Sequence, residues 1–356
     1  MSNSLTIALA SLGGLVLAGV VAHGAWQARR ADPKRAERSP ERVEPREPVM
    51  GDLPPPGAGE AGAPGLLAEL SVPAPERRAS RRMLPRLDAL IDSIATLGVE
   101  LPVAGAQVLA HLPTTRRAGG KPFMIEGLNS ETGEWESSVA GQSYGEFQAG
   151  VQLANRTGAL NEIEYSEFVQ KVQAFADAIG ALPDFPDMLE AVAAARELDQ
   201  FAGTHDAQLA VHLRAHGSAW SVGYIQQQAG RHGFVPGVVP GRLVMPAVDE
   251  GAPPVLTLSF DSQAALADDP NLAAVRDVML SFDVPQTDPK AAPFAAWQAA
   301  AQALAQAMDA AVVDDHGRAL GAESFAAIGN ELGQLYAALE GRDLAAGSPA
   351  ARRLFS

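Results

Sequence analysis

Two stretches of sequence decide the fold: VQLANRTGALNEIEYSEFVQKVQAFADAIG at 151–180 and LSFDVPQTDPKAAPFAAWQAAAQALAQAMD at 280–309. Each opens with an alternating run, passes through a polar turn and continues with helical periodicity, with aromatic residues early and alanines late. In the first stretch, Phe168, Val172 and Phe175 fall on one stripe with Ile179. We therefore expect two related units, each ending in a strand, a turn and a helix.

The patterns on either side of these stretches extend the same order. In the first half they predict strands at 89–99, 121–128 and 145–154, and helices at 104–112, 161–180 and 187–202. In the second half they predict strands at 207–215, 235–244, 254–262 and 277–284, and helices at 219–232 and 293–310. The fold class is therefore α+β: two β-α-β-β-α-type units with antiparallel sheets covered by helices on one face. Divergent duplication and convergent patterning both explain the likeness of the halves.

The charge is unevenly distributed along the 356 residues. The chain has 27 basic and 42 acidic residues, a net charge of −15. Residues 1–86 carry 12 basic and 9 acidic residues, whereas residues 87–356 carry 15 basic and 33 acidic. The net negative charge of residues 87–356 repels the phosphate backbone of nucleic acids, which argues against a nucleic-acid partner. The absence of cysteine excludes disulfides, thiolate metal sites and cysteine nucleophiles, and it fits a reducing compartment.

The first 28 residues contain no Asp, Glu, Lys or Arg, and 5–22 is an apolar run long enough to cross a bilayer as a helix. The charges that follow at once are Arg29, Arg30, Lys34 and Arg35. The positive-inside rule then predicts a single-pass inner-membrane anchor formed by residues 5–26, with the N-terminus periplasmic and the rest cytoplasmic. The same four basic residues would contact anionic lipid. The alternative is a cleaved signal peptide, but its usual positive N-terminal region is missing.

A tether follows the anchor. Residues 45–75 contain 13 Pro and Gly, too many to bury an apolar core, and a linker is therefore expected over 29–80. A basic cluster closes it: Arg77, Arg78, Arg81, Arg82 and Arg86. These arginines would either contact lipid headgroups, or form a solvated helical turn or pair with the acidic body. The expected divisions are an anchor at 1–28, a linker at 29–80, a first unit at 81–204 and a second at 205–345.

Four motifs suggest chemistry, and none has the context that the chemistry requires. The G-x-G-x-x-G at 57–62 lies among prolines, without the strand and helix of a dinucleotide site. Ser143 lies in a G-x-S-x-G motif, but a strand rather than a helix is expected to follow it. His212 and His216 are too far apart along a strand to share a metal. Asp-Asp-His-Gly at 314–317 is more typical of a hairpin turn. We therefore expect no catalytic residue, metal or cofactor.

The order of parts resembles the ZipA family of bacterial cell-division proteins. The likeness is carried by the membrane exit at 21–30 (VAHGAWQARR), by 221–234 (SVGYIQQQAGRHGF), and by Asp-Val-Pro at 283–285 with the segments up to a helix at 321–340. Together it covers residues 1–35 and 205–340, whereas 87–204 has no counterpart. The resemblance implies a non-enzymatic adaptor that binds the C-terminal tail of the tubulin-like protein FtsZ and holds the division ring at the membrane.

In this family the tail occupies a shallow apolar groove on the sheet face that helices leave open. Alternation assigns the helix-covered core to Leu209, Val211, Leu213, Leu256, Leu258, Phe260, Val278, Leu280 and Phe282. The resemblance places the groove on Gln208, Val239, Ser259, Asp261, Gln263, Met279 and Ser281. Only Val239 and Met279 of these are apolar. Three alternatives stay open: residues 87–204 supply the groove, another envelope or division partner replaces the tail, or the protein is an anchored hydrolase using Ser143.

Overall fold

The computed structural model describes residues 86–249, 251–267, 269 and 272–356. The expected anchor at 1–28 and linker at 29–80 lie outside these residues. Within the described part, none of the helices combines the length and apolarity needed to cross a bilayer.

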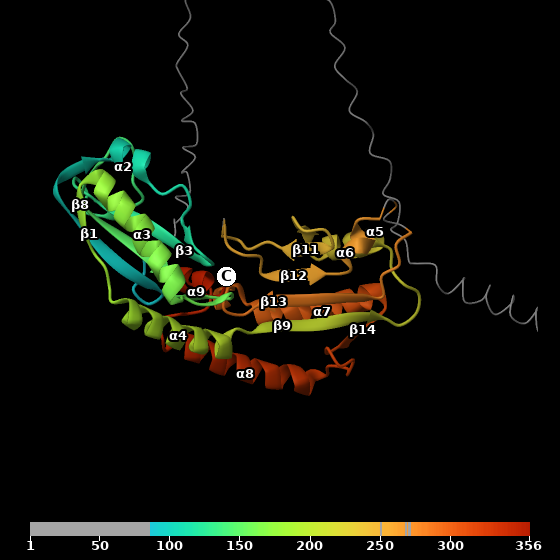
Figure 1. The fold of residues 1–356 in the computed structure, drawn as a ribbon. Coiled ribbons are helices and arrows are strands. Elements are labelled where there is room, and N and C mark those ends of the chain that lie inside the picture. Colours follow the sequence, from blue (N-terminus) through green and yellow to red (C-terminus); the bar gives the residue numbers. More distant parts are fainter. Residues whose placement is uncertain (1–85, 250, 268, 270–271) are drawn as a thin grey trace, which may run out of the picture.

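The first unit is an antiparallel sheet with helices on one side (Figure 1). Its elements are β1 (Asp92–Ala104), α2 (Gly105–His111), β2 (Arg117–Ala118), β3 (Lys121–Asn129), β4 (Trp135–Glu136), β5 (Ser143–Gln152), β6 (Ala154–Asn155), β7 (Gly158–Ala159), α3 (Glu162–Ile179), β8 (Ala181–Asp184) and α4 (Met188–His205). The strands lie in the order β2-β3-β5-β1-β8, with β4 paired to β3, and β6 and β7 form a separate hairpin.

The second unit has its own six-stranded sheet, in the order β10-β11-β12-β13-β9-β14. Its elements are β9 (Gln208–Ala215), α5 (Val222–Arg231), β10 (Val235–Pro236), β11 (Arg242–Met245), β12 (Leu256–Ser259), α6 (Ser262–Ala265), β13 (Asp277–Asp283), the 3₁₀ helix η1 (Pro289–Ala291), α7 (Pro293–Met308) and β14 (Ala310–Val313). All the strand pairs of this sheet are antiparallel.

The two sheets share one topology. The four main strands of the first unit, numbered in chain order, are β1, β3, β5 and β8, and they lie in the sheet in the order second, third, first, fourth. The four main strands of the second unit are β9, β12, β13 and β14, and they lie in the same order. This is the split β-α-β arrangement, with one helix after the first strand and one after the third. The expected antiparallel α+β fold is therefore confirmed. The fourth strands β8 and β14 are additional to the prediction, because four residues are too few to show a periodicity.

Aromatic residues fill the first core between the sheet and α3. The predicted stripe is correct: Phe168, Val172, Phe175 and Ile179 are all buried. Phe123 contacts Phe168 edge-on, with ring centroids 5.7 Å apart. Helix α3 begins with a capping box between Asn161 and Glu164 and ends at Gly180, which has a φ of 71°.

The second core lies between its sheet and helices α5 and α7. Two tryptophans join the layers: Trp297 Nε1 donates to the Leu280 carbonyl at 3.0 Å, and Trp220 Nε1 donates to the Met308 carbonyl at 2.9 Å. The predicted core face is confirmed, since its nine residues are either buried or packed against the buried cluster. The opposite face of the sheet is therefore the one that α5 and α7 leave open.

The C-terminal segment joins the two units. Helix α8 (Ala322–Glu340) places Phe325 in the second core and Leu339 in the first. Helix α9 (Pro349–Leu354) then buries Leu354 in the first core, with Phe355 after it. The second unit, expected to be 205–345, thus contributes its end to the other core, and 346–356 belong to the first unit. In Figure 1, α4 lies below the first sheet and α8 below the second. The chain after α8 meets the end of α4, where Arg342 stacks over the Phe201 ring at 4.6 Å.

Two predicted strands of the second unit are shorter than expected. The strand predicted at 235–244 is a hairpin of β10 and β11, because Pro236, Pro240 and the left-handed Gly241 (φ 77°) turn the chain between them. The strand predicted at 254–262 ends at Ser259, where Asp261 caps the short helix α6.

Candidate partner-binding face

The open face of the second sheet is built by alternate residues of β9, β12 and β13. Register places Met279 between Ser259 and His212 in one row. The next row has Ser281 between Thr257 and Ala210. Most of these side chains are half-buried, and they remain accessible to a partner.

The structure brings four of the seven expected groove residues together. Met279 and Ser259 are register partners, while Gln208 Nε2 lies 3.4 Å from Ser281 Oγ. Ser281 itself is only 1% exposed, so it supports the face rather than offering a contact.

The other three residues lie elsewhere. Asp261 and Gln263 follow the end of β12, where the Asp261 carboxylate accepts from the Gln263 amide at 2.9 Å, so their placement on the strand face was wrong. Val239 lies in the β10–β11 turn and is 51% exposed. The face therefore has an interior part around Met279 and an edge around Val239.

One end of the open face is strongly polar. His212 Nδ1 lies 2.6 Å from Asp277 Oδ1, and its Nε2 lies 3.2 Å from Asp315. Arg214 Nε donates to the other oxygen of Asp277 at 2.9 Å. The contacts at the two ring nitrogens hold His212 of β9 between β13 and the turn after β14. An apolar ligand would gain little at this end, because each polar group would have to be desolvated.

The first unit touches the opposite end of the face. Arg156 donates to Asp206 and Asp283, each at 2.6 Å. Asp206 raises the pKa of Arg156 above its ordinary value, with Asp283 adding to the effect. Burial raises the pKa of Asp283, and Arg156 opposes that shift. The first unit thus contacts the margin of this sheet, while the row around Met279 remains accessible.

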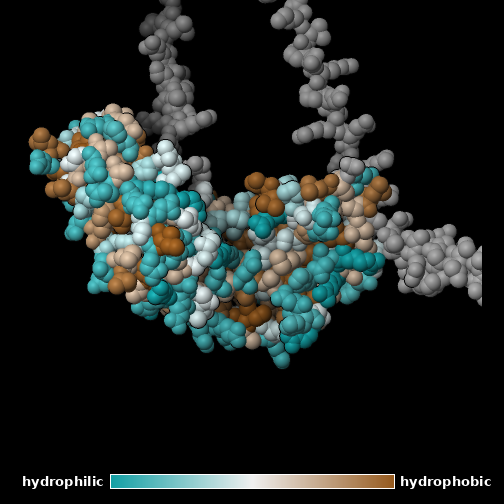
Figure 2. Space-filling model, viewed as in Figure 1, coloured by the Kyte–Doolittle hydropathy of each residue, from teal (hydrophilic) through white to brown (hydrophobic). Residues whose placement is uncertain are grey.

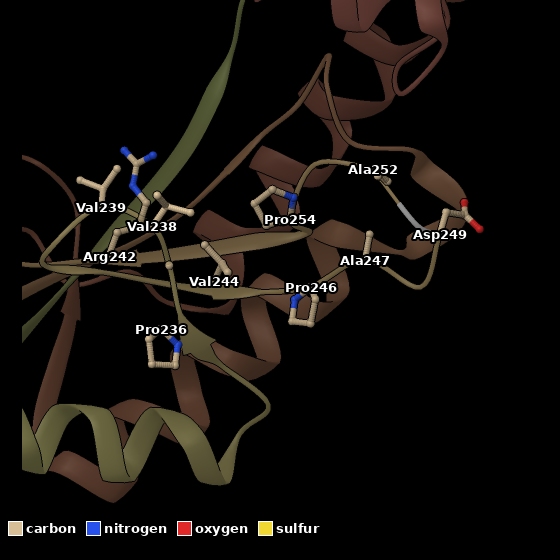
Figure 3. Close-up of a pocket in the computed structure, with 12 residues that line it drawn as sticks. Pro236, Val238, Val239, Arg242, Val244, Pro246, Ala247, Asp249, Ala252 and Pro254 are labelled. Carbon is tan, nitrogen blue, oxygen red and sulfur yellow. The ribbon is translucent and has the colours of Figure 1, made fainter. Parts of the chain in front are cut away.

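An apolar hollow of about 590 Å³ lies at the outer edge of the second sheet. Figure 2 shows hydrophobic residues gathered over this edge, and Figure 3 shows the hollow between the β10–β11 turn and the loop after β11. Its apolar lining comprises Pro236, Val238, Val239, Val244, Pro246, Ala247, Ala252 and Pro254. Val238 is completely exposed, and so is Val248 in the neighbouring loop. Apolar side chains gathered at one edge are typical of an interaction site.

Sequence reasoning found one residue of this hollow, Val239, and missed the hollow itself. The sequence does indicate the hairpin that forms one wall of the hollow: Val-Pro-Gly occurs twice in 235–241 (VPGVVPG), a pattern typical of a tight turn rather than of a continuous strand. Residues 246–249 and 251–254 face that hairpin only because β11 and β12 are paired, and no local pattern reports this pairing.

The remaining motifs take structural positions. Ser143 begins β5, and a strand follows it rather than the helix of a nucleophile elbow. Asp314 accepts from the backbone amides of His316 and Arg318, which closes the turn after β14. Among the described residues, no group of three or more acidic or histidine side chains could hold a metal ion.

A search of protein-family models finds none that matches this chain, and a search of curated proteins finds no similar sequence. The functional case therefore rests on the accessible row around Met279, the apolar hollow around Val239 and the order of parts along the chain.

Proposed function

We propose that this protein is a membrane-anchored cell-division adaptor of the ZipA type. It would bind the C-terminal tail of FtsZ through the second unit and hold the division ring at the cytoplasmic membrane. The observation that carries the proposal is a sheet face left open by its helices and bordered by an apolar hollow. An extended peptide needs this combination: backbone contacts along the sheet edge and pockets for its apolar side chains.

The hollow supplies anchors that the polar interior of the face lacks. Val238, Val239 and Val244 contribute apolar surface at the edge. Met279 is a separate apolar contact further in, with Ser259 between it and β11. Burying such surface yields about 25 cal/mol per Å², so a few side chains of a peptide tail suffice for weak binding. Many tethered adaptors acting on one filament would raise the total affinity by avidity.

The test is a titration of the full chain, purified in neutral detergent, with a peptide of the FtsZ tail. Val239→Asp puts a charge into the hollow and should weaken binding at least about tenfold, or 1.4 kcal/mol. Val139→Asp is the matched control, because Val139 is 52% exposed on the first unit and Val239 is 51% exposed. Met279→Asp should weaken binding as well.

Failure of the wild-type chain to bind the peptide would exclude the FtsZ proposal. Equal weakening by the two valine variants would show that the hollow is not the site. The full chain is used because a fragment ending at 345 would lack α9, which completes the first core.

A second candidate is an anchored structural or interaction protein with a different envelope or division partner. It is favoured by the polar network of His212, Asp277 and Arg214, which suits a charged ligand better than an apolar tail. Arg214→Ala should weaken binding of such a partner and leave tail binding unchanged, because Arg214 pairs with Asp277, outside the row of Met279.

A further inference from the structure

The first described residues lie on the open face of the first sheet. The Leu87 amide donates to Glu126 Oε1 at 3.2 Å, and the Arg86 guanidinium donates to the Trp135 carbonyl. The Leu87 side chain fills the space above Gly150, where a Cβ would overlap it. The chain therefore reaches the first unit on the face opposite to α3.

This face combines acidic and apolar side chains. Register sets Gln148 between Thr96 and Glu126, and Glu146 between Gly98 and Leu128. The apolar members of the face are the half-buried Ile94, Met124, Leu128 and Trp135 and the exposed Leu182. Its carboxylates are Glu126, Glu146 and Asp184.

A hollow of about 330 Å³ opens beside Arg86 on this face. Glu126 and Glu134 line it, together with Trp135 and Gln148. Glu126 is only 4% exposed, and its second oxygen accepts from Gln148 Nε2 at 2.8 Å. Its lining thus holds two carboxylates and one guanidinium, that of Arg86, which leaves a net negative charge next to the point where the preceding chain attaches.

The residues directly before this point have the complementary composition. Residues 77–85 read RRASRRMLP, which is four arginines followed by Met83, Leu84 and Pro85. Nine extended residues reach about 30 Å, nearly the length of the ten-residue strand β5 at about 3.3 Å per residue. Because the segment is covalently joined to Arg86, its local concentration at this face is high, which favours a weak contact.

We propose that the open face of the first sheet is the docking surface for residues 77–85 of the same chain. The arginines would pair with Glu146, Asp184 and the acidic hollow, and Met83 and Leu84 would cover the apolar residues between them. The first unit would then hold the tether. The open face of the second sheet is not attached to the tether, so the second unit would remain free to bind partners. This inference does not depend on the identity of the partner.

The test is hydrogen exchange on the full chain in neutral detergent. Amides of 77–84 should exchange about tenfold or more slowly than those of 57–63, a reference segment of the same tether. Glu146→Gln combined with Asp184→Asn should remove most of this protection. The matched control is Glu323→Gln with Glu331→Gln, which removes two exposed carboxylates from α8 and should leave the protection unchanged.

Two results would overturn the proposal. The first is exchange of 77–84 as fast as the reference segment in the wild-type chain. The second is protection that appears only after transfer into bilayers containing phosphatidylglycerol and that is insensitive to the Glu146 and Asp184 changes; this would assign the arginines to lipid headgroups.

Discussion

Arg353 in α9 forms a bidentate ion pair with Asp92 at the start of β1, 261 residues earlier in the chain, with Nη1 2.7 Å from Oδ2. Arg353 also donates to the Arg86 carbonyl at 2.9 Å. The C-terminal helix and the first described residues are thus fixed at one place on the first sheet. Burial raises the pKa of Asp92, and Arg353 opposes that shift.

We predict that Asp92→Ala lowers the free energy of unfolding by about 3–5 kcal/mol, because it leaves a largely buried guanidinium without its partner. Replacing both residues, Asp92→Ala with Arg353→Met, should cost less than the single change. Urea unfolding followed by circular dichroism measures both. A double variant less stable than the single one would contradict this account.

We predict that Leu354→Ala lowers the free energy of unfolding by about 2–5 kcal/mol, since it opens a cavity in the first core. Leu354 is fully buried. Leu189→Ala on α4 is the control, because Leu189 is 67% exposed and its change should cost at most about 0.5 kcal/mol. Equal midpoints of thermal unfolding for the two variants would show that α9 does not stabilise the first core.

We predict that Gly150→Ala lowers the free energy of unfolding by about 1–3 kcal/mol, because the new methyl group overlaps Leu87. It should also speed amide exchange over 86–90. Gly145→Ala on the same strand is the control, since a Cβ there meets Ser130 Oγ at an ordinary 3.6 Å. Unchanged exchange at 86–90 in the Gly150 variant would mean that the packing of Leu87 on Gly150 does not hold residues 86–90 on the sheet.

Lys121 gives a prediction about pH. Its side chain is 1% exposed, and its ammonium donates to Asn155 Oδ1 at 2.8 Å. Burial lowers the pKa of Lys121 below its ordinary 10.5. At pH values between the lowered pKa of Lys121 in the folded protein and 10.5, Lys121 binds a proton more fully in the unfolded chain than in the folded one. The contribution of Lys121 to the free energy of unfolding therefore rises with pH in that range. The pKa of Tyr336 is raised to about 12 by burial, so its phenol does not account for a rise below 10.5.

Lys121→Met should therefore remove a rise in stability that the wild-type protein shows as pH approaches 10.5 from below. Urea unfolding at a series of alkaline pH values measures the slope. An identical slope in the two proteins would show that the Lys121 ammonium is not desolvated in the fold.

The sequence by itself determined the α+β class, the long helices and the side of β9, β12 and β13 that faces the core. These features depend on local periodicity, as the buried stripe of Phe168 and Phe175 shows. The resemblance also pointed to Val239, which is exposed, and to Met279, which is half-buried on the open face of the second sheet. It placed Asp261 and Gln263 wrongly, because the alternation of 254–262 continues past the residue where β12 ends.

Only the tertiary structure decided which distant segments meet. The sheet order, the hollow around Val239 and the return of α9 to the first core all depend on contacts between residues far apart in the chain. Such contacts follow from the packing of whole elements. The strands β8 and β14 are too short for their sequences to indicate which strand each pairs with. A periodic pattern indicates which side of a helix or strand is buried. It does not indicate which other element covers that side, because any apolar surface of the right shape can bury it.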